Sequence, residues 1–93
     1  MVLFVAYDLH NHNRDYASVI QTIKSADGWC HPQGSVWLID TLLTPLQWVN
    51  KLKAATHGDP DDEFFVVQTV KNAAWEKMDQ EAINWINSPS RRW

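Results

Sequence analysis

The chain has 93 residues, of which 45% are hydrophobic and 20% are charged, and its formal net charge is −3. This composition fits one folded domain with a single modest core and excludes an intrinsically disordered chain. The mild acidity argues against tight non-specific binding of nucleic acid, which favours a basic surface. One cysteine, Cys30, excludes an intrachain disulfide. Because no apolar run approaches the roughly 18 residues of a membrane span and the N-terminus lacks a secretion signal, we expect a cytoplasmic protein.

The first part of the chain predicts a strand followed by a helix. Residues 2–7 are a continuous run of β-branched, aromatic and other apolar side chains, which is typical of a central strand covered on both faces. Asn13 is a suitable N-cap for a helix that opens with residues 14–16. Apolar side chains recur at helical spacing from residue 16 to residue 23, so we expect about three turns that end near residues 27–28.

A β-hairpin is predicted next. Two β-prone runs at residues 29–31 and 35–41 flank a Pro/Gly turn at residues 32–34. Alternation along the second run places Trp37 and Ile39 on one face and the residues between and beside them on the other.

The clearest helix start lies at residues 44–47. Thr44 is a capping residue, Pro45 suits the first helical position, and Gln47 completes a capping box. Gly58 is the expected stop signal of this helix.

The rest of the chain contains one more strand and one short helix. An acidic connector at residues 59–63 leads into a strand at residues 64–70. In the segment from residue 71 to residue 93, Asp79 is the expected cap of a helix over residues 80–87, which packs Ile83 and either Ile86 or Trp85 inward.

The predicted order is β-α-β-β-α-β followed by a helix. This is the ferredoxin-like α+β arrangement, with a four-stranded antiparallel sheet, two helices on one face and an added C-terminal helix. We assign residues 1–70 to the core and residues 71–93 to a helical extension and tail of the same domain. Six tryptophans cannot all be interior in so small a domain, so we expect an apolar surface patch and, most simply, a homodimer formed through it.

Asp8 is the first candidate site residue. It stands where the first strand meets a loop, which fixes the side chain and leaves it reachable. In a symmetric dimer, two copies of Asp8 facing each other would share a divalent ion that bridges a scissile phosphate. The alternative interpretation is structural: a carboxylate that caps the helix entry or pairs with Arg14.

Other polar residues offer weaker metal and acid–base hypotheses. His10 and His12 lie beside Asp8 and suit a transition metal, although alternate loop residues need not converge. His31 is a candidate general base if the hairpin lies alongside the first strand. The acidic run at residues 61–63 lacks the spacing of an EF-hand, so a solvated turn is its default interpretation.

Nucleic-acid binding has its own candidates. Arg91 and Arg92 flank Trp93 and combine attraction for phosphate with a ring on which bases stack, and Arg14 adds a charge near Asp8. The alternative interpretation of the three terminal residues is a solubilising tail.

Several short motifs carry a family resemblance through their order and spacing. They are, in chain order, Tyr7-Asp8-Leu9, Arg14-Asp15-Tyr16, Gly28-Trp29-Cys30, Ser35-Val36-Trp37-Leu38-Ile39, Asp61-Asp62-Glu63 before Phe64-Phe65-Val66-Val67, and Trp75 ahead of Gln80-Glu81-Ala82. Over about residues 2–87 the chain resembles the Cas2-like family of CRISPR-associated small proteins, and most closely its SinR-family relatives. The resemblance implies a ferredoxin-like fold, a homodimer formed across the sheets and nucleic-acid binding. For some members it implies a nuclease dependent on a divalent metal such as Mg²⁺ or Mn²⁺, with the aspartate that matches Asp8.

Two features depart from Cas2 proper. A tryptophan-bearing helical tail replaces a strand that exchanges between partners, and the chain is acidic. Both argue against the integrase-scaffold role of that family. Two functional hypotheses follow: a nucleic-acid-associated Cas2-like dimer with weak divalent-metal-dependent endonuclease activity, or a non-enzymatic interaction module, such as a defence or toxin–antitoxin component, that uses its aromatic surface to bind a protein partner.

Overall fold

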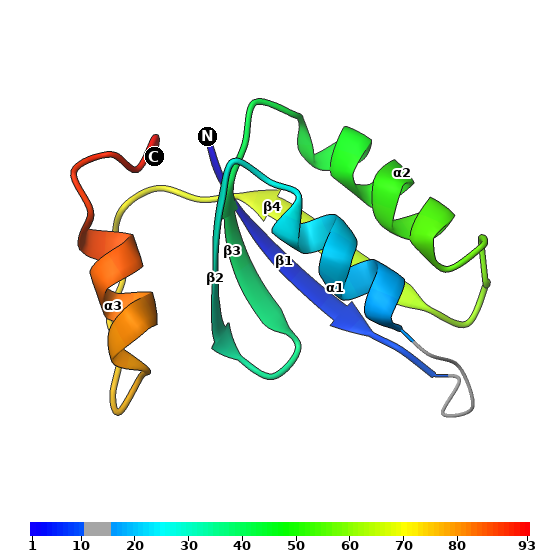
Figure 1. Cartoon of the computed structure of the whole chain (residues 1–93), viewed down its shortest axis with the longest axis horizontal. Coiled ribbons are helices and arrows are strands. Elements are labelled where there is room, and N and C mark those ends of the chain that lie inside the picture. The colour runs from blue at the N-terminus through cyan, green and yellow to red at the C-terminus, as the bar shows by residue number, and fades with distance from the viewer. Residues whose placement is uncertain (11–15) are drawn as a thin grey trace.

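An α+β fold with one four-stranded antiparallel sheet and three helices is found in the computed structural model, which describes residues 1–10 and 16–93 (Figure 1). In chain order the elements are β1 (Val2–Asp8), α1 (Ala17–Lys24), β2 (Gly28–Gln33), β3 (Val36–Asp40), α2 (Pro45–Ala55), β4 (Glu63–Gln68) and α3 (Gln80–Asn87). Within the described ranges, no helix has the length and apolar character that crossing a bilayer requires.

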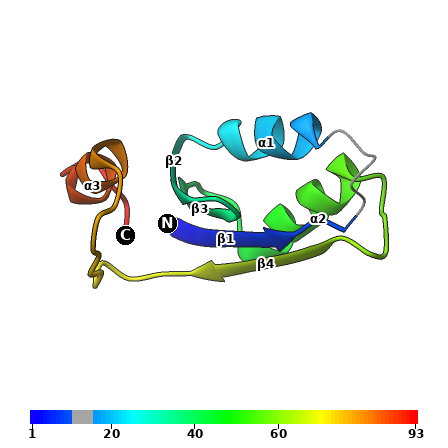
Figure 2. The same ribbon diagram turned by 90° about the horizontal axis from the view of Figure 1, so that it is seen from below.

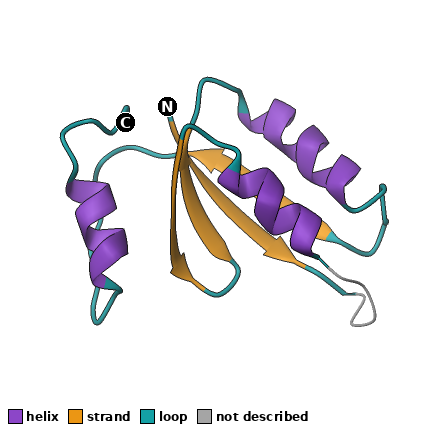
Figure 3. Ribbon diagram, in the orientation of Figure 1, coloured by secondary structure: helices purple, strands orange, loops and turns teal. Residues whose placement is uncertain are grey.

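The strands lie in the order β2-β3-β1-β4, and each neighbouring pair is antiparallel. From β1 the chain passes through α1 to β2, which pairs with the edge of β3 that faces away from β1. From β3 it passes through α2 to β4, which pairs with the edge of β1 that faces away from β3 (Figure 3). β1 is therefore an inner strand, as its apolar run predicted, and β2 and β4 form the two edges.

One face of the sheet carries the hydrophobic core. Both α1 and α2 lie on this side (Figure 2), which we call the covered face. Alternate residues of β1 and β3 point toward the two helices and lose nearly all their exposure, because strand side chains alternate between faces. The core residues are Leu3, Val5, Val19, Ile23, Trp37, Ile39, Trp48 and Leu52.

The hairpin of β2 and β3 is confirmed, with a shorter turn than predicted. β2 continues through Pro32 to Gln33, so the predicted turn at residues 32–34 is wrong in its first two positions. An edge strand tolerates proline because one side of its backbone has no strand partner, and the register shifts between Cys30 and Gln33.

The first helix starts later than predicted. The structure places Tyr16 at the N-cap position of α1, without a capping hydrogen bond from its side chain, and the helix has 8 residues instead of about three turns. The predicted cap Asn13 lies outside the described residues. The predicted inward stripe is confirmed at Val19 and Ile23, which are fully buried.

The capping box of α2 is confirmed. The Gln47 backbone N–H donates to the Thr44 hydroxyl at 3.2 Å, and the Thr44 N–H donates to the Gln47 side-chain carbonyl at 2.8 Å. Gly58 adopts a φ of 72°, and its N–H donates to the Lys53 carbonyl at 2.8 Å. A left-handed glycine that captures a carbonyl of the last turn closes the helix end as predicted.

The C-terminal segment returns to the sheet. α3 lies beside the edge strand β2 (Figure 1). Asp79 precedes the helix as predicted, although its side chain makes no capping hydrogen bond. Ile86 is buried as predicted and Ile83 is half-buried, whereas the second fully buried residue of α3 is Ala82.

The sheet face opposite α1 and α2 is only partly covered. Phe65 and Val67 of β4 lie opposite Ala6 and Phe4 of β1 on this side, and we call these four residues the open face. Phe65 remains 61% exposed and Val67 40% exposed, so the predicted apolar surface exists. The tryptophans divide accordingly: Trp37 and Trp48 are buried, whereas Trp29 and Trp75 are exposed.

Candidate functional site

Two carboxylates face each other at one end of the open face. Asp8, the last residue of β1, lies directly opposite Glu63, the first residue of β4. Directly opposed residues of an antiparallel pair project to the same side of the sheet, a few ångströms apart. Their side chains are 69% and 71% exposed, so this end of the sheet presents two unshielded negative charges.

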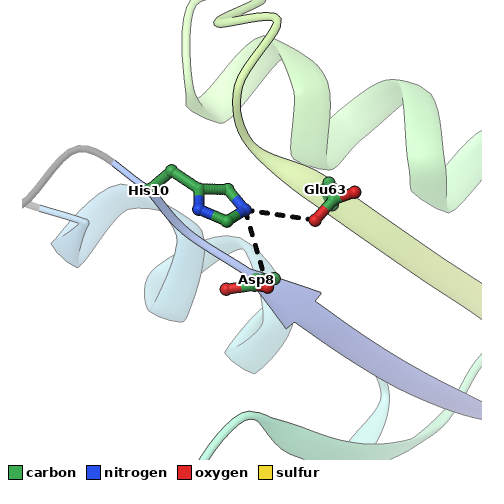
Figure 4. A group of neighbouring side chains, drawn as sticks. All are labelled: Asp8, His10 and Glu63. Atoms are coloured by element: carbon green, nitrogen blue, oxygen red, sulfur yellow. Dashed lines mark hydrogen bonds and ion pairs between the residues drawn. The ribbon is translucent and has the colours of Figure 1, made fainter.

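His10 brings an imidazole between them. Its Nε2 atom lies 3.1 Å from Oε2 of Glu63 and 3.5 Å from Oδ2 of Asp8 (Figure 4). One ligand atom from each residue lies within 4.8 Å of the other two. We call Asp8, His10 and Glu63 the acidic cluster. Within residues 1–10 and 16–93, this is the one group of three or more His, Cys, Asp or Glu side chains gathered at metal-binding distances.

A fourth residue fixes the position of the loop that carries His10. The backbone N–H of His10 donates to Oδ1 of Asp62 at 3.0 Å, and the Tyr16 hydroxyl donates to the same oxygen at 2.8 Å. Asp62 therefore links the loop after β1, the start of α1 and the start of β4. The default interpretation of residues 61–63 as a solvated turn is thus too simple.

The electrostatics of the cluster favour a cation. The hydrogen bond with Glu63 is the largest cause that raises the pKa of His10 above its ordinary value, and the negative charge of Asp8 adds to it. The negative charges that favour the protonated imidazole also attract other cations, and a metal ion would have to displace that proton.

The donor set fits a divalent metal ion by type and by spacing. Two carboxylates and one imidazole are ordinary ligands of such ions. The side chains lie at the rim of a shallow, open hollow that is lined by Ala6, Tyr7, Phe64 and Phe65 beside the two carboxylates. Any ion held there would keep coordination positions open to the solvent side.

Sequence reasoning named Asp8 and His10 but missed Glu63 as their partner. The signal was the antiparallel register of β1 and β4, which places the first residue of one strand opposite the last residue of the other. His12 and Arg14, which were candidates near Asp8, lie outside the described residues.

His31 does not join the cluster. Its ring stacks on Trp37 with centroids 3.7 Å apart, and its Nε2 pairs with the Gly34 carbonyl at 2.8 Å. Trp37 belongs to the covered face, whereas Asp8 projects to the opposite side of the sheet. The general-base hypothesis for His31 therefore finds no support in this arrangement.

The tail residues make intramolecular contacts. Arg92 donates from Nε to Asp40 at 2.8 Å and from its terminal nitrogen to Asp27 at 2.8 Å. The guanidinium group of Arg91 lies 4.3 Å above the ring of Trp85 and 3.8 Å from Asp40. Trp93 is partly buried. Nucleic-acid binding by this tail stays a prediction, and it would have to compete with these carboxylates.

No family model matches the chain, and no curated protein or solved structure is significantly similar to it. The resemblance to Cas2-like proteins therefore depends on the sequence motifs.

Proposed function

We propose that the protein is a Cas2-like homodimer with a ferredoxin-like fold that binds nucleic acid and acts as a divalent-metal-dependent endonuclease at Asp8. The observation that carries the proposal is the position of the acidic cluster, at the end of β1 and on the side of the sheet that α1 and α2 leave open. Counted from β4, the order β4-β1-β3-β2 with its two crossovers supports the ferredoxin-like assignment.

The open face supports the dimer. Phe65 and Val67 expose apolar surface beside half-buried Phe4 and Ala6. A second copy that packs the same residues against this face would remove that surface from water in a symmetric, self-complementary contact. Such a dimer brings two acidic clusters to the rims of one interface. The single, unpaired Cys30 fits a cytoplasmic location for it.

The chain's own residues would bind the ion and admit the substrate. Asp8 and Glu63 would hold a divalent ion between them, and His10 would complete the ligand set from the loop. When bound, the ion supplies electrophilic assistance to a phosphodiester and activates water. The hollow beside the cluster is shallow and open, which suits a polymer backbone passing over the surface better than a small molecule enclosed in a cavity.

The test is a cleavage and binding assay on labelled single- and double-stranded RNA and DNA. Wild type, Asp8→Ala and the control Glu76→Gln are compared in Mg²⁺, in Mn²⁺ and in EDTA. Glu76 is an exposed carboxylate outside the cluster. We expect cleavage that requires the metal and Asp8 but not Glu76. Cleavage that survives in EDTA or in Asp8→Ala would reject the proposal.

A second function is favoured by the extent of exposed apolar surface. Phe65, Val67, Val70 and Trp75 all remain exposed along β4 and the segment that follows it. A non-enzymatic interaction module would use such a surface to bind a protein partner. Neither binding nor cleavage in the assay, together with a hetero-complex that Phe65→Ser and Trp75→Ala abolish, would establish this alternative.

A further inference from the structure

The acidic cluster is arranged as a ligand set that one chain completes without a partner. Opposed carboxylates on neighbouring strands repel each other, and Asp8 and Glu63 occupy such a pair. His10 lies against both of them from the loop. Two of the three side chains are anchored on paired strands, and the third is held through its backbone by Asp62. The backbone positions of all three donors are therefore fixed by the fold.

The spacing of the donors matches that around a small ion. Metal–ligand bonds of about 2.1 Å place two tetrahedral ligands about 3.4 Å apart. The imidazole nitrogen lies 3.1 Å and 3.5 Å from its two carboxylate oxygens, which is already close to this value. The remaining separation, between the two carboxylates, is within 4.8 Å. Because both carboxylates are well exposed, a small rotation of either side chain would shorten this separation to the spacing of two metal ligands.

The ligand types select among ions. Mg²⁺ prefers an octahedral shell of oxygens and keeps several waters, so an imidazole is a poor ligand for it. Zn²⁺, Mn²⁺ and their neighbours accept imidazole and carboxylate together, and Zn²⁺ binds such sites more tightly than Mn²⁺. The mixture of one nitrogen and two oxygens thus favours a first-row transition metal.

We infer that Asp8, His10 and Glu63 form a transition-metal site in each chain, with one ion per chain and a preference for Zn²⁺ and Mn²⁺ over Mg²⁺. This deepens the proposed function, on which it rests for its biological use, since it names the preferred ions and sets the stoichiometry at one ion per chain. It differs from an ion shared by two copies of Asp8 across a dimer axis, which would bind one ion for every two chains.

The experiment measures metal binding in the absence of nucleic acid. Untagged, metal-free protein is titrated with Zn²⁺, Mn²⁺ and Mg²⁺ by calorimetry, and Zn²⁺ binding is checked by competition with a chromophoric chelator. We expect one Zn²⁺ per chain, weaker Mn²⁺ binding and Mg²⁺ binding that is weaker still. His10→Ala and Glu63→Gln should each weaken Zn²⁺ binding by about tenfold or more.

Two matched variants serve as controls. His57→Asn removes an exposed histidine outside the cluster, at a position with φ 57° that asparagine tolerates, and Glu76→Gln removes an exposed carboxylate outside the cluster. Both should bind Zn²⁺ like wild type. Half an ion per chain, a tighter Mg²⁺ than Zn²⁺, or unchanged Zn²⁺ binding in both cluster variants would overturn the inference.

The outcome separates this inference from the proposed function. Zn²⁺ binding that depends on the cluster, without cleavage of any nucleic acid, retains the metal site and rejects the nuclease. Mg²⁺-dependent cleavage that requires Asp8 but is unchanged in His10→Ala and Glu63→Gln retains the nuclease and rejects this ligand set.

Discussion

An aspartate lies near each end of the central strand β1, Asp40 at the end of β3 and Asp8 at the end of β1 itself, and their environments are opposite. At one end Asp40 lies opposite Val2 and is 3% exposed, whereas at the other end Asp8 lies opposite Glu63 and is well exposed. Asp40 is surrounded by cations: Arg92 at 2.8 Å, Arg91 at 3.8 Å and the terminal amino group of Met1 at 3.9 Å.

The different surroundings of the two aspartates indicate a structural role for Asp40 and a capacity to bind a cation for Asp8. The charge of Asp40 is fully compensated inside the molecule, and its partners join both termini to the end of β3 (Figure 1). Asp8 has one imidazole and a second carboxylate as its neighbours, so its charge is not compensated. Removing one partner of a buried, compensated carboxylate destabilises a fold, whereas an uncompensated carboxylate retains the capacity to bind a cation.

The largest expected change in the free energy of unfolding comes from removing the negative charge of Asp40. Asp40→Asn leaves three cations around a buried neutral group, and we expect it to lower the free energy of unfolding by about 2–3 kcal/mol in chemical denaturation. Asp27→Asn is the control, because Asp27 is exposed and contacts only Arg92 among these cations. A loss in the control equal to that of Asp40→Asn would mean that Asp40 has no special role.

The reactivity of Cys30 reports whether the C-terminal tail stays packed at the end of the sheet where Asp40 lies. Burial raises the pKa of the Cys30 thiol from about 9 to about 11, so at pH 8 the reactive thiolate is about a hundredfold scarcer than for an unperturbed thiol. Alkylation by iodoacetamide should therefore be slow in the native protein and fast in denaturant. Since the raised pKa belongs to the folded state, stability should also fall as the pH rises from 9 toward 11.

The same probe distinguishes the two ends. Arg91 lies near Cys30, so loosening the tail in Asp40→Asn should speed the alkylation, and Glu63→Gln at the far end of the sheet should not. Equal alkylation rates in wild type and Asp40→Asn, measured by mass spectrometry, would show that the tail does not protect the thiol.

The open face provides the next test, because a dimer would bring the uncompensated ends of two chains close to an interface. Phe65→Ser should weaken self-association by about tenfold or more in sedimentation, since exposed aromatic side chains dominate such contacts. Leu42→Ser is the control, because Leu42 is exposed in the loop before α2 and not on the sheet. A wild-type chain that stays monomeric at high concentration would contradict the proposed dimer.

The sequence correctly predicted features that depend on residues close together in the chain. The capping box of Thr44 and Gln47 spans four positions, and the alternation around Trp37 spans a few more, so both were confirmed. The partner of His10 lies 53 positions away and that of Arg92 lies 52 positions away. No local pattern specifies such pairs, because they depend on strand register and on where the tail returns to the sheet.

The consequence was an incomplete description of each end of the sheet. The run of Arg91, Arg92 and Trp93 suggested a free nucleic-acid-binding element, because its bonds to Asp40 and Asp27 were invisible in the sequence. Glu63 was assigned to a connector, because its position opposite Asp8 was equally invisible. Local composition therefore revealed neither the carboxylates that contact the tail nor the carboxylate opposite Asp8.

The smallest predicted effect has the opposite sign from the first. In metal-free protein at pH 8.5, Glu63→Gln removes one of two opposed negative charges while its amide oxygen can still accept from His10, so we expect a gain in the free energy of unfolding of less than about 1 kcal/mol. Glu76→Gln, an exposed substitution away from the cluster, should leave stability unchanged. Chemical denaturation in EDTA measures both. A gain at Glu63 with a loss at Asp40 would mean that the fold tolerates the acidic cluster at a cost in stability, which is expected of a ligand site and not of a structural ion pair. A loss at Glu63 as large as that at Asp40 would make both ends structural.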